Sequence, residues 1–409
     1  MGRVAHLRFG EYLDSSTHPA AGDKLRLGLA HSDLSKMKSL HLDTQPDWRG
    51  GQHQILLALR GLRARGYHAE LLALRDAPLA RHAAAEGFVV HAFSNRLVRL
   101  DAMRQIRHIL KSNPFDIVHA HDPHAITAAF LAGAHKRSAL VIHRRVTFPI
   151  KRGRFSLNRY RAARRIIAVS RFVADRITEA GLASTRIGIV YDGVELPHII
   201  TPEALHEMRQ ETRRAWSIPD DDVVVGCVGY FVEGKGQDAL IRAWPSVLEE
   251  FPATRLLLVG DGPLRSHLET LARESGAPDS IIFTGFLENI SAAYRAMDLF
   301  AFPAKMEGLG SSLLLAMAHG LPVVAADSGG VPEVIQDGGN GLLTRGMEPE
   351  DYAKAIRTLL ESPARAAELG ASAHDTIERR FTAGRMVEGL IENYELALSE
   401  GAKSARPAQ

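Results

Sequence analysis

A lysine flanked by glycines is the first group in the sequence whose type and spacing suit phosphate binding. Lys235 lies between Gly234 and Gly236 in GYFVEGKG, after a predicted strand and before the helical pattern DALIRAW. An ammonium group beside a helix start suits an anion because the unpaired N–H groups there are partly positive. The glycine spacing matches neither a Walker A loop nor a dinucleotide fingerprint. A solvated loop lysine is the alternative interpretation.

A second anion site is predicted in the stretch FPAKMEGLGSSLLLAMAHGLP. Here Gly310 precedes Ser311 and Ser312, which open a helix that is apolar on nearly all sides and must therefore be buried. The N–H groups at this helix start could cradle a diphosphate. Glu307, just before them, could bind sugar hydroxyls. In the alternative interpretation, Glu307 only caps the helix.

A pair of glycines marks a third candidate site in the first half of the chain. Gly50 and Gly51 in WRGGQ lie between a predicted strand and a predicted helix. Because they have no side chains, the backbone can approach a ligand closely, and the helix start again favours an anion. A tight strand–helix turn explains the same pair equally well.

Two clusters resemble metal ligands, but the sequence predicts no metal at either. His119 and His121 lie two residues apart in a predicted strand, so they share a face and could ligate together. Pro123 breaks that strand before His124, and neither a cysteine nor a second carboxylate lies nearby in the sequence. The acidic run 220–222 follows a proline at a strand start, which indicates a turn. We expect neither a metal nor another cofactor.

Taken in order, these motifs are similar to the signature of family 4 glycosyltransferases. The signature contains Gly-Gly after the first strand, HxH after a middle strand, Gly-x(5)-Lys-Gly, EGxG at a buried helix and GGxPE shortly after it. The resemblance covers about residues 38–400. It implies a GT-B fold and retaining transfer from a nucleotide sugar. A narrower resemblance, through RGGQ, HRRVTFP and EGLGSS, is to enzymes that use lipopolysaccharide-type acceptors.

The resemblance also implies a role for each matching residue. In the predicted catalytic set, His121 would face the reacting sugar, Lys235 would bind the diphosphate and Glu307 would bind sugar hydroxyls. The loop at 287–289 would hold the base edge through backbone groups. The predicted donor-binding set is Gly50, Gly51, Gly229, Tyr230, Lys235, Leu287, Asn289, Glu307, Gly308, Leu309, Gly310, Ser311 and Ser312.

Two positions depart from the family pattern. Tyr230 stands where an arginine is usual, which removes one cation from the diphosphate site. Leu315 stands where the family has a carboxylate that binds the nucleotide ribose. Losing one charge-assisted hydrogen bond without replacement costs about 1.5–3 kcal/mol. The departures motivate one rival interpretation, a non-catalytic protein with a basic binding surface.

Strands and helices must alternate along the chain to position these motifs. Helical patterns lie between apolar runs, which predicts an α/β protein with two doubly wound, Rossmann-like domains facing a central cleft. This is the GT-B arrangement that the resemblance implies. The predicted strands are 38–43, 68–74, 88–93, 115–121, 139–143, 165–170 and 187–190, then 223–231, 255–260, 280–286, 298–303 and 322–326.

Domain limits follow from the two series of strands. We predict a disordered extension over 1–36 and an N-terminal acceptor-binding domain over 37–200. A C-terminal domain over 201–382 would bind the nucleotide sugar. The helix at about 383–400 is expected to pack back on the first domain, and 401–409 is expected to be a flexible tail.

Composition narrows the class of protein. Of the 409 residues, 45% are hydrophobic and 24% are charged, which is ordinary for a globular chain. Cys227 is the single cysteine and lies in an apolar run, which excludes a disulfide framework and predicts a buried thiol. No run approaches 18 apolar residues, so we expect no membrane-spanning helix. The N-terminus also lacks the apolar core of a secretory signal.

Charge is distributed unevenly beneath a net charge of +3. Residues 136–176 hold 13 basic residues and one acidic residue. Such a field attracts an anionic glycan, a glycolipid or an anionic membrane surface; a solvated basic face without a ligand is the alternative. The segment has few aromatic residues and no recognition motif, so we expect no nucleic acid partner. The predicted acceptor and membrane set is Arg144, Arg145, Lys151, Arg152 and Arg154, with Phe148 and Phe155 beside it.

These observations predict a retaining, metal-independent glycosyltransferase. The donor would be a nucleotide-diphosphate sugar, and the acceptor a glycan or lipid-linked glycan in lipopolysaccharide or other cell-envelope glycan synthesis. The expected location is the cytoplasm, peripheral to the inner face of the cytoplasmic membrane. The nearest rival enzyme is a nucleotide-sugar epimerase of the same fold, which needs no acceptor and leaves the basic segment unexplained.

Overall fold

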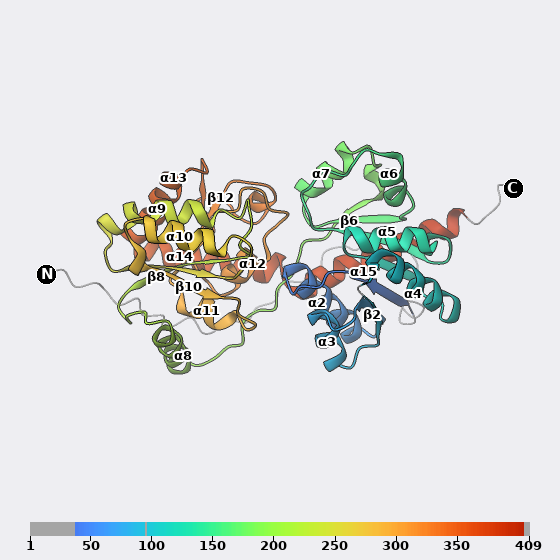
Figure 1. Ribbon diagram of the computed structural model, residues 1–409, viewed down its shortest axis with the longest axis horizontal. Helices are drawn as coiled ribbons and strands as arrows, with labels where there is room; N and C mark the ends of the chain where they lie inside the picture. The colour runs from blue at the N-terminus through green and yellow to red at the C-terminus, as the bar shows by residue number, and fades with distance from the viewer. Residues whose placement is uncertain (1–36, 95, 405–409) are drawn as a thin grey trace, which may run out of the picture.

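Thirteen strands form two separate parallel sheets in this computed structural model, which describes residues 37–94 and 96–404 (Figure 1). Most strands are nearly continuous apolar runs, as in VVVGCV and VVAA, because helices cover both faces of each sheet. The predicted α/β class with two doubly wound sheets is confirmed. The predicted extension over 1–36 lies outside the described residues.

The first sheet has seven strands and belongs to the lobe that we call the first lobe. In spatial order the strands are β3 (Val90–Phe93), β2 (His68–Leu74), β1 (Lys38–Leu42), β4 (Ile117–Ala120), β5 (Ala139–Arg144), β6 (Arg165–Ala168) and β7 (Ile187–Ile189). The helices of this lobe are α2 (Gly50–Ala64), α3 (Pro78–Ala85), α4 (Val98–Ser112), α5 (Pro123–Ala132), α6 (Arg154–Arg161), α7 (Arg171–Glu179) and α15 (Ala383–Ser404).

The second sheet has six strands and belongs to the second lobe. In spatial order the strands are β10 (Ile281–Gly285), β9 (Thr254–Val259), β8 (Val223–Val228), β11 (Leu299–Phe302), β12 (Val323–Ala326) and β13 (Leu342–Thr344). The helices are α8 (Pro202–Ala215), α9 (Gln237–Glu250), α10 (Arg265–Glu274), α11 (Ser291–Ala296), α12 (Ser311–Ala318), α13 (Pro349–Glu361) and α14 (Pro363–Arg380).

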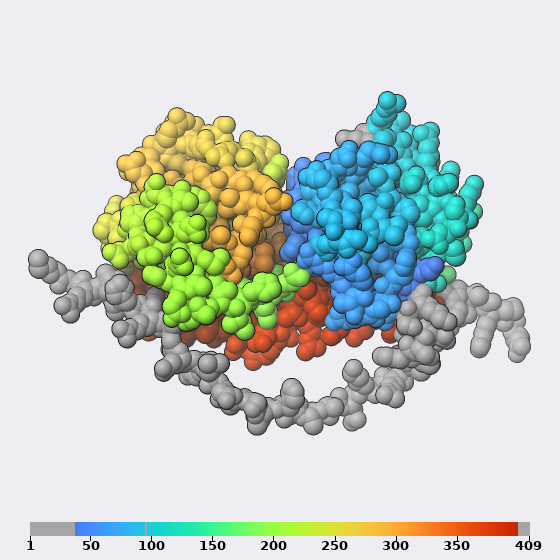
Figure 2. All heavy atoms as spheres, turned by 90° about the horizontal axis from the view of Figure 1, so that it is seen from below, coloured from blue at the N-terminus to red at the C-terminus, as the bar shows by residue number. Residues whose placement is uncertain are grey.

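Each sheet reverses its strand order at one place, between β1 and β4 in the first and between β8 and β11 in the second. Ligands of doubly wound sheets bind at such switch points, outside the carboxyl ends of the strands. The candidate motifs lie in the loops that follow these four strands. The space-filling view shows the molecule hollowed between the two lobes (Figure 2).

The chain passes between the lobes twice, and the two passages pair with each other. The N–H of Val194 donates to the carbonyl of Phe381 at 2.9 Å, and the N–H of Ala383 donates to the carbonyl of Val194 at 2.9 Å. After the second passage, helix α15 returns to the first lobe and contacts α2, β5 and β6. It approaches α2 so closely that a Cβ on Gly61 would lie 2.4 Å from a methyl group of Val387.

Two elements, β13 and α15, depart most from the prediction. Strand β13 was not predicted, because its three residues LLT are too few to show a pattern and gain their order by pairing with β12. Helix α15 continues to Ser404, four residues into the predicted flexible tail. The remainder of that tail lies outside the described residues.

Four histidines are buried on one face of the first sheet. His41 pairs in register with His119, and His121 and His143 follow on the neighbouring strand ends. The ring centroid of His119 lies 4.0 Å from that of His121 and 5.5 Å from that of His143. The hydroxyl of Tyr394 on α15 lies 2.6 Å from Nδ1 of His119, so α15 covers this row.

Burial keeps this histidine row neutral. It lowers the pKa of His41 to about 3, and the charge of Arg145 contributes to that shift. Burial also lowers the pKa values of His119, His121 and His143 well below 6.5. A folded protein with neutral histidines is sensitive to acid, because unfolded histidines bind protons that the folded ones refuse.

The free energy of unfolding should therefore fall as the pH drops below about 6.5. Below that pH the unfolded chain binds more protons at the four histidines. Asp43, whose pKa burial and the nearby Asp122 raise to about 7, and Asp192, whose pKa burial also raises, act in the opposite direction. The histidines outnumber them, so urea unfolding should show a loss of about 2 kcal/mol or more between pH 7 and pH 5.

A matched variant separates this effect from general acid sensitivity. His143→Phe keeps a ring at the site and removes one proton-binding group, so its stability should depend less steeply on pH. Equal free energies of unfolding at pH 7 and pH 5 in the wild type would contradict this account.

Candidate active site

The N-termini of two helices face each other across the gap between the lobes. A Cβ on Gly50, the first residue of α2, would lie 2.3 Å from Oγ of Ser311, the first residue of α12. Gly310 directly precedes α12 with φ 103°, and it provides no side-chain cap for the helix. Each helix start contributes about half a positive charge and unpaired N–H groups. The two predicted glycine turns therefore form one anion-binding region.

Lys235 and Glu307 form an ion pair at this region. Nζ of Lys235 lies 2.5 Å from Oε2 of Glu307, and the two side chains are 33% and 19% exposed. Oε1 of Glu307 accepts from the N–H of Gly308 at 3.3 Å. The pair places a donor group and an acceptor group side by side, four residues before helix α12. A ligand that carries both phosphates and hydroxyls could therefore bind both partners.

A cation from the first lobe lies over the position where the family pattern loses one. The guanidinium carbon of Arg49 lies 4.2 Å from the ring centroid of Tyr230. Such a contact is a cation–π interaction. Arg49 also pairs with Asp47 at 2.5 Å and directly precedes Gly50. The sequence did not indicate this residue, because the contact joins positions 181 residues apart.

Backbone groups and one carboxylate complete the contact between the lobes. A Cβ on Gly308 would lie 2.5 Å from the carbonyl oxygen of Arg145. Glu333, from the GGxPE motif, accepts from the N–H groups of Arg171 and Phe172 at 2.8 Å each. Its carboxylate thus caps the start of α7 in the other lobe, where negative charge is favoured.

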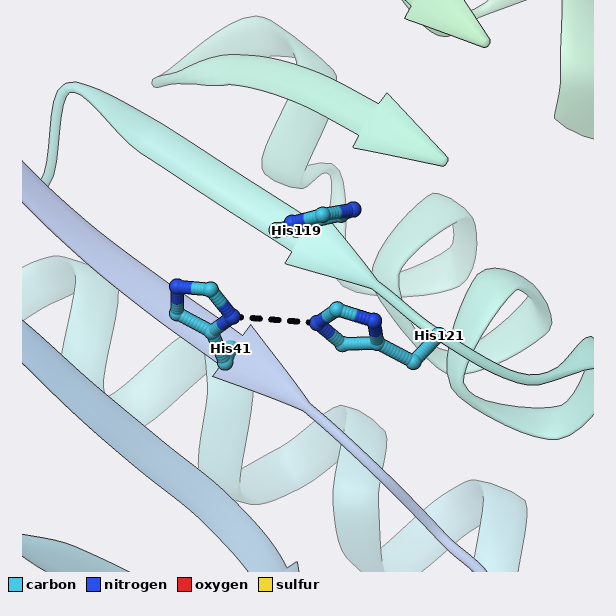
Figure 3. Close-up of side chains that lie close together, drawn as sticks. All are labelled: His41, His119 and His121. Atoms are coloured by element: carbon cyan, nitrogen blue, oxygen red, sulfur yellow. Dashed lines mark hydrogen bonds between the residues drawn. The ribbon is translucent and has the colours of Figure 1, made fainter. Parts of the chain in front are cut away.

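His121 lies in the first lobe with both ring nitrogens engaged. Its Nδ1 lies 3.1 Å from Nη1 of Arg145, and its Nε2 lies 3.0 Å from Nδ1 of His41. Figure 3 shows the rings of His41 and His121 facing each other beside His119. Arg145 is held by Asp192, with 2.8 Å between Nε and Oδ1. The predicted contact of His121 with a donor sugar therefore requires a change at Nδ1.

The described residues contain two groups whose geometry could hold a metal ion. The ligand atoms of His41, His119 and His121 lie within 4.8 Å of one another, and so do those of His374, Asp375 and Glu378. The sequence considered His119 and His121 together but missed His41, because a lone histidine in an apolar strand resembles a core residue. His124, which the sequence analysis set aside because Pro123 precedes it, belongs to neither group.

Two named side chains of the predicted donor-base loop and the residue at the predicted ribose position are engaged within the second lobe. Asn289 turns its Oδ1 to the N–H of Ser291 at 3.1 Å, as a local cap. Leu287 and Leu315 pack against the apolar core. The predicted role of the backbone groups of this loop in holding a base edge stays a prediction.

Two of the five residues predicted to face a membrane, Arg144 and Arg145, lie inside the first lobe instead. Arg144 is only 5% exposed and donates to the hydroxyl of Tyr160 at 3.0 Å and to the carbonyl of Phe148. The side chain of Arg145 is 11% exposed and faces Asp192. The prediction failed because a charged residue is expected at the surface, whereas each of these guanidinium groups has partners inside the lobe.

The remaining members of that group stay at the surface. Lys151, Arg152 and Arg154 are exposed, and so are the rings of Phe148 and Phe155, at 73% and 53%. The bond from buried Arg144 to the Phe148 carbonyl holds this loop in place. Among the described residues, no helix is both long and apolar enough to cross a bilayer.

Comparison with known proteins assigns both lobes to the same kind of enzyme. The family model described as Glycosyltransferase Family 4 matches residues 48–197, and the model described as Glycosyl transferases group 1 matches residues 208–376. The chain is similar to a GDP-mannose-dependent alpha-(1-6)-phosphatidylinositol monomannoside mannosyltransferase of Mycolicibacterium smegmatis. That match is 34% identical over 236 residues, which are 54% of this chain and 60% of the relative.

A second relative and a solved structure extend the likeness. The D-inositol 3-phosphate glycosyltransferase of Salinispora arenicola is 31% identical over 340 residues, 75% of this chain and 73% of that protein. The match to the first curated relatives spans about half of their length, 47–60% in the first four. The crystal structure of Anabaena Alr3699/HepE with UDP and glucose has a TM-score of 0.77 and 24% identity, covering 88% of this chain and 99% of that one. The two sheets, the paired motifs and these matches together place the chain in the family 4 glycosyltransferases of GT-B fold.

Proposed function

We propose that this protein is a retaining glycosyltransferase that moves a sugar from a nucleotide-diphosphate donor to an acceptor hydroxyl. The observation that carries the proposal is the meeting of Gly50 with Ser311 beside the Lys235–Glu307 pair. Two helix starts and a lysine form a fixed positive field, which is what a departing diphosphate requires. The relative from Mycolicibacterium smegmatis is named as GDP-mannose-dependent, which supports a donor of this class.

Each group in the gap has a defined task in this reaction. Lys235 and the N–H groups at Ser311 and Ser312 would stabilise the charge of the leaving diphosphate. Arg49 would add a cation from the first lobe, offsetting the loss at Tyr230. Glu307, released from Lys235, would accept hydrogen bonds from sugar hydroxyls. Retention implies attack from the face of the leaving group, so a leaving phosphate oxygen can accept the acceptor's proton.

The acceptor is proposed to be a glycan or lipid-linked glycan of the cell envelope, such as lipopolysaccharide. The exposed loop with Phe148, Lys151, Arg152, Arg154 and Phe155 supports an anionic partner, because three cations and two aromatic rings lie within eight residues. The relative from Mycolicibacterium is named for a phosphatidylinositol-linked acceptor, which is also an anionic lipid. We assign the loop to an anionic membrane surface at which such an acceptor resides.

Transfer is tested with a panel of UDP- and GDP-sugars, with and without an anionic glycolipid. We expect nucleotide release that requires the glycolipid. Lys235→Ala should lower turnover about ten- to hundredfold or more, because it removes a charge-assisted bond to the diphosphate. Glu307→Ala should also lower turnover and should reduce discrimination between sugars more than between bases.

Lys305→Ala is the matched control, since Lys305 is an exposed lysine in the neighbouring loop after β11 and the hydrogen bond from its N–H to the carbonyl of Gly234 survives the change. Near-normal turnover of Lys235→Ala would contradict the assignment of the diphosphate site. A new sugar epimer formed without acceptor would favour the rival epimerase.

Activity should survive chelation of divalent metals. The positive field in the gap comes from Lys235, Arg49 and two helix starts, so no metal is needed to stabilise the diphosphate. The measurement is turnover after dialysis against EDTA, with and without added Mg²⁺ or Mn²⁺. Loss of turnover that either cation restores would contradict metal independence.

Binding to anionic vesicles should depend on the exposed loop. Each basic residue near an anionic membrane adds about 1 kcal/mol, so changing Lys151, Arg152 and Arg154 together to Gln should weaken co-sedimentation strongly. Binding of the wild type should also fall at high salt, where the Debye length shrinks to about 3 Å. The matched control changes three exposed arginines elsewhere, Arg365, Arg379 and Arg385, to Gln. Equal loss in both triple variants would show only a net-charge effect, against the membrane assignment.

A further inference from the structure

A chain of hydrogen bonds starts at Arg145 and runs in one direction through the first lobe. Nη1 of Arg145 lies 3.1 Å from Nδ1 of His121, and Nε2 of His121 lies 3.0 Å from Nδ1 of His41 (Figure 3). Nε2 of His41 lies 3.3 Å from Oγ of Ser39, which donates to the carbonyl of His68 at 3.4 Å. These five residues come from β1, β2, β4 and the end of β5.

The chemistry of the guanidinium fixes the position of every proton in this chain. Arg145 can only donate, so His121 must accept at Nδ1. A neutral His121 then carries its proton on Nε2 and donates it to His41. For the same reason His41 carries its proton on Nε2, toward Ser39. Each donor meets an acceptor, and reversing any one bond would place two donors or two acceptors together.

Arg145, the first member of the chain, is held by the first lobe and lies against the second. The Nε of Arg145 donates to Asp192 at 2.8 Å, at the end of the first sheet. The carbonyl of Arg145 lies so close to Gly308 of the second lobe that a Cβ there would be 2.5 Å away. Gly308 directly follows Glu307, the proposed sugar-binding carboxylate. The backbone of Arg145 therefore lies against the segment that would hold the donor, while Asp192 holds its guanidinium.

We propose that Arg145 is a positioning residue that locks His121 in one neutral tautomer, with an accepting Nδ1 and a proton on Nε2 committed to His41. The inference rests on the proposed function for its consequence in catalysis. A sugar hydroxyl that replaces Arg145 at Nδ1 would meet an acceptor. His121 thus serves the sugar by accepting a hydrogen bond, and it does not act as an acid.

The surroundings agree with neutral rings throughout the chain. Burial lowers the pKa values of His121 and His41, and Arg145 contributes to both shifts. Nη2 of Arg145 has no hydrogen-bond partner among the described residues and is itself buried. A sugar hydroxyl that approaches His121 would therefore also find a free donor on the same guanidinium.

A metal ion at the three histidines would be incompatible with this chain. Nε2 of His121 and Nδ1 of His41 face each other and share one proton in the proposed arrangement. A metal bound between them would require both nitrogens to present lone pairs, beside the charge of Arg145. The proposed chain therefore predicts a proton between these two nitrogens, whereas a metal site predicts a metal ion there.

Neutron diffraction on crystals of the wild-type protein grown in D₂O tests the chain without any substrate. We expect deuterium on Nε2 of His121 and on Nε2 of His41, and none on Nδ1 of either ring. Deuterium on Nδ1 of His121, a doubly deuterated ring, or a metal ion between the histidines would overturn the proposal. Because no turnover is measured, this result does not depend on the proposed function.

Kinetics test the role in the reaction. Arg145→Lys keeps the charge beside Asp192 but cannot bond Asp192 and His121 in the same planar fork. We expect kcat to fall about ten- to hundredfold, the loss typical of a charge-assisted hydrogen bond, while the KM for the donor stays nearly unchanged. Tyr394→Phe is the control, because it removes the bond to His119 and leaves the chain intact.

A second variant guards against misfolding of the first. His41→Phe preserves a ring in the row and removes the acceptor for the His121 proton, so it should lower kcat in the same way. If both variants fold and retain wild-type kcat while Tyr394→Phe is normal, the positioning role is wrong. If Arg145→Lys raises KM and leaves kcat unchanged, Arg145 binds the donor instead, and the proposal fails equally.

Discussion

The arrangement of the protein depends on two positive helix ends that meet across one gap. Helices α2 and α12 start against each other, with Gly50 at the distance where any side chain would collide with Ser311. Like charges at this distance repel, so the contact is unfavourable until an anion lies between the helices. The paired passages at Val194 and Phe381 and the cap that Glu333 places on α7 hold the lobes in this position. An anionic leaving group that binds between the two helix starts relieves this repulsion, and the relief adds to its affinity.

A second constraint lies beneath the first, in the histidine row of the first sheet. His143 has no hydrogen-bond partner for either ring nitrogen among the described residues, and His119 has none for Nε2. Buried polar atoms without partners lower the free energy of unfolding. An ordinary apolar core at this position would not carry that cost. In His121 and His41, by contrast, both ring nitrogens have partners, in Arg145, in each other and in Ser39. The hydrogen-bonded chain through His121 and His41 therefore differs from the neighbouring His119 and His143, whose buried ring nitrogens lack partners.

Much of this architecture could be predicted from the sequence, because it depends on local patterns. Alternating apolar runs and helical periods gave both sheets, and the motifs after β1, β4, β8 and β11 converge because carboxyl ends of parallel strands share an edge. Contacts between distant segments could not be read in this way. The contacts of Arg49 with Tyr230 and of Glu333 with the start of α7 join different lobes. The residue type of Arg144 likewise does not reveal that its side chain is buried. His41 escaped notice because its partners lie 78 and 80 residues away.

Helix α15 has a consequence for how the chain is made. The first lobe is synthesised early, yet part of its apolar face waits for the last segment of the chain. Met386, Val387, Leu390, Tyr394 and Ala397 fill that face, and Tyr394 also closes over His119. Domains generally fold in the order in which they are synthesised. Here the lobe that is made first is completed last, so during translation its exposed apolar strip persists until the second lobe has emerged. Truncation at the carboxyl end would therefore damage the half of the protein that lies farthest from it in the sequence.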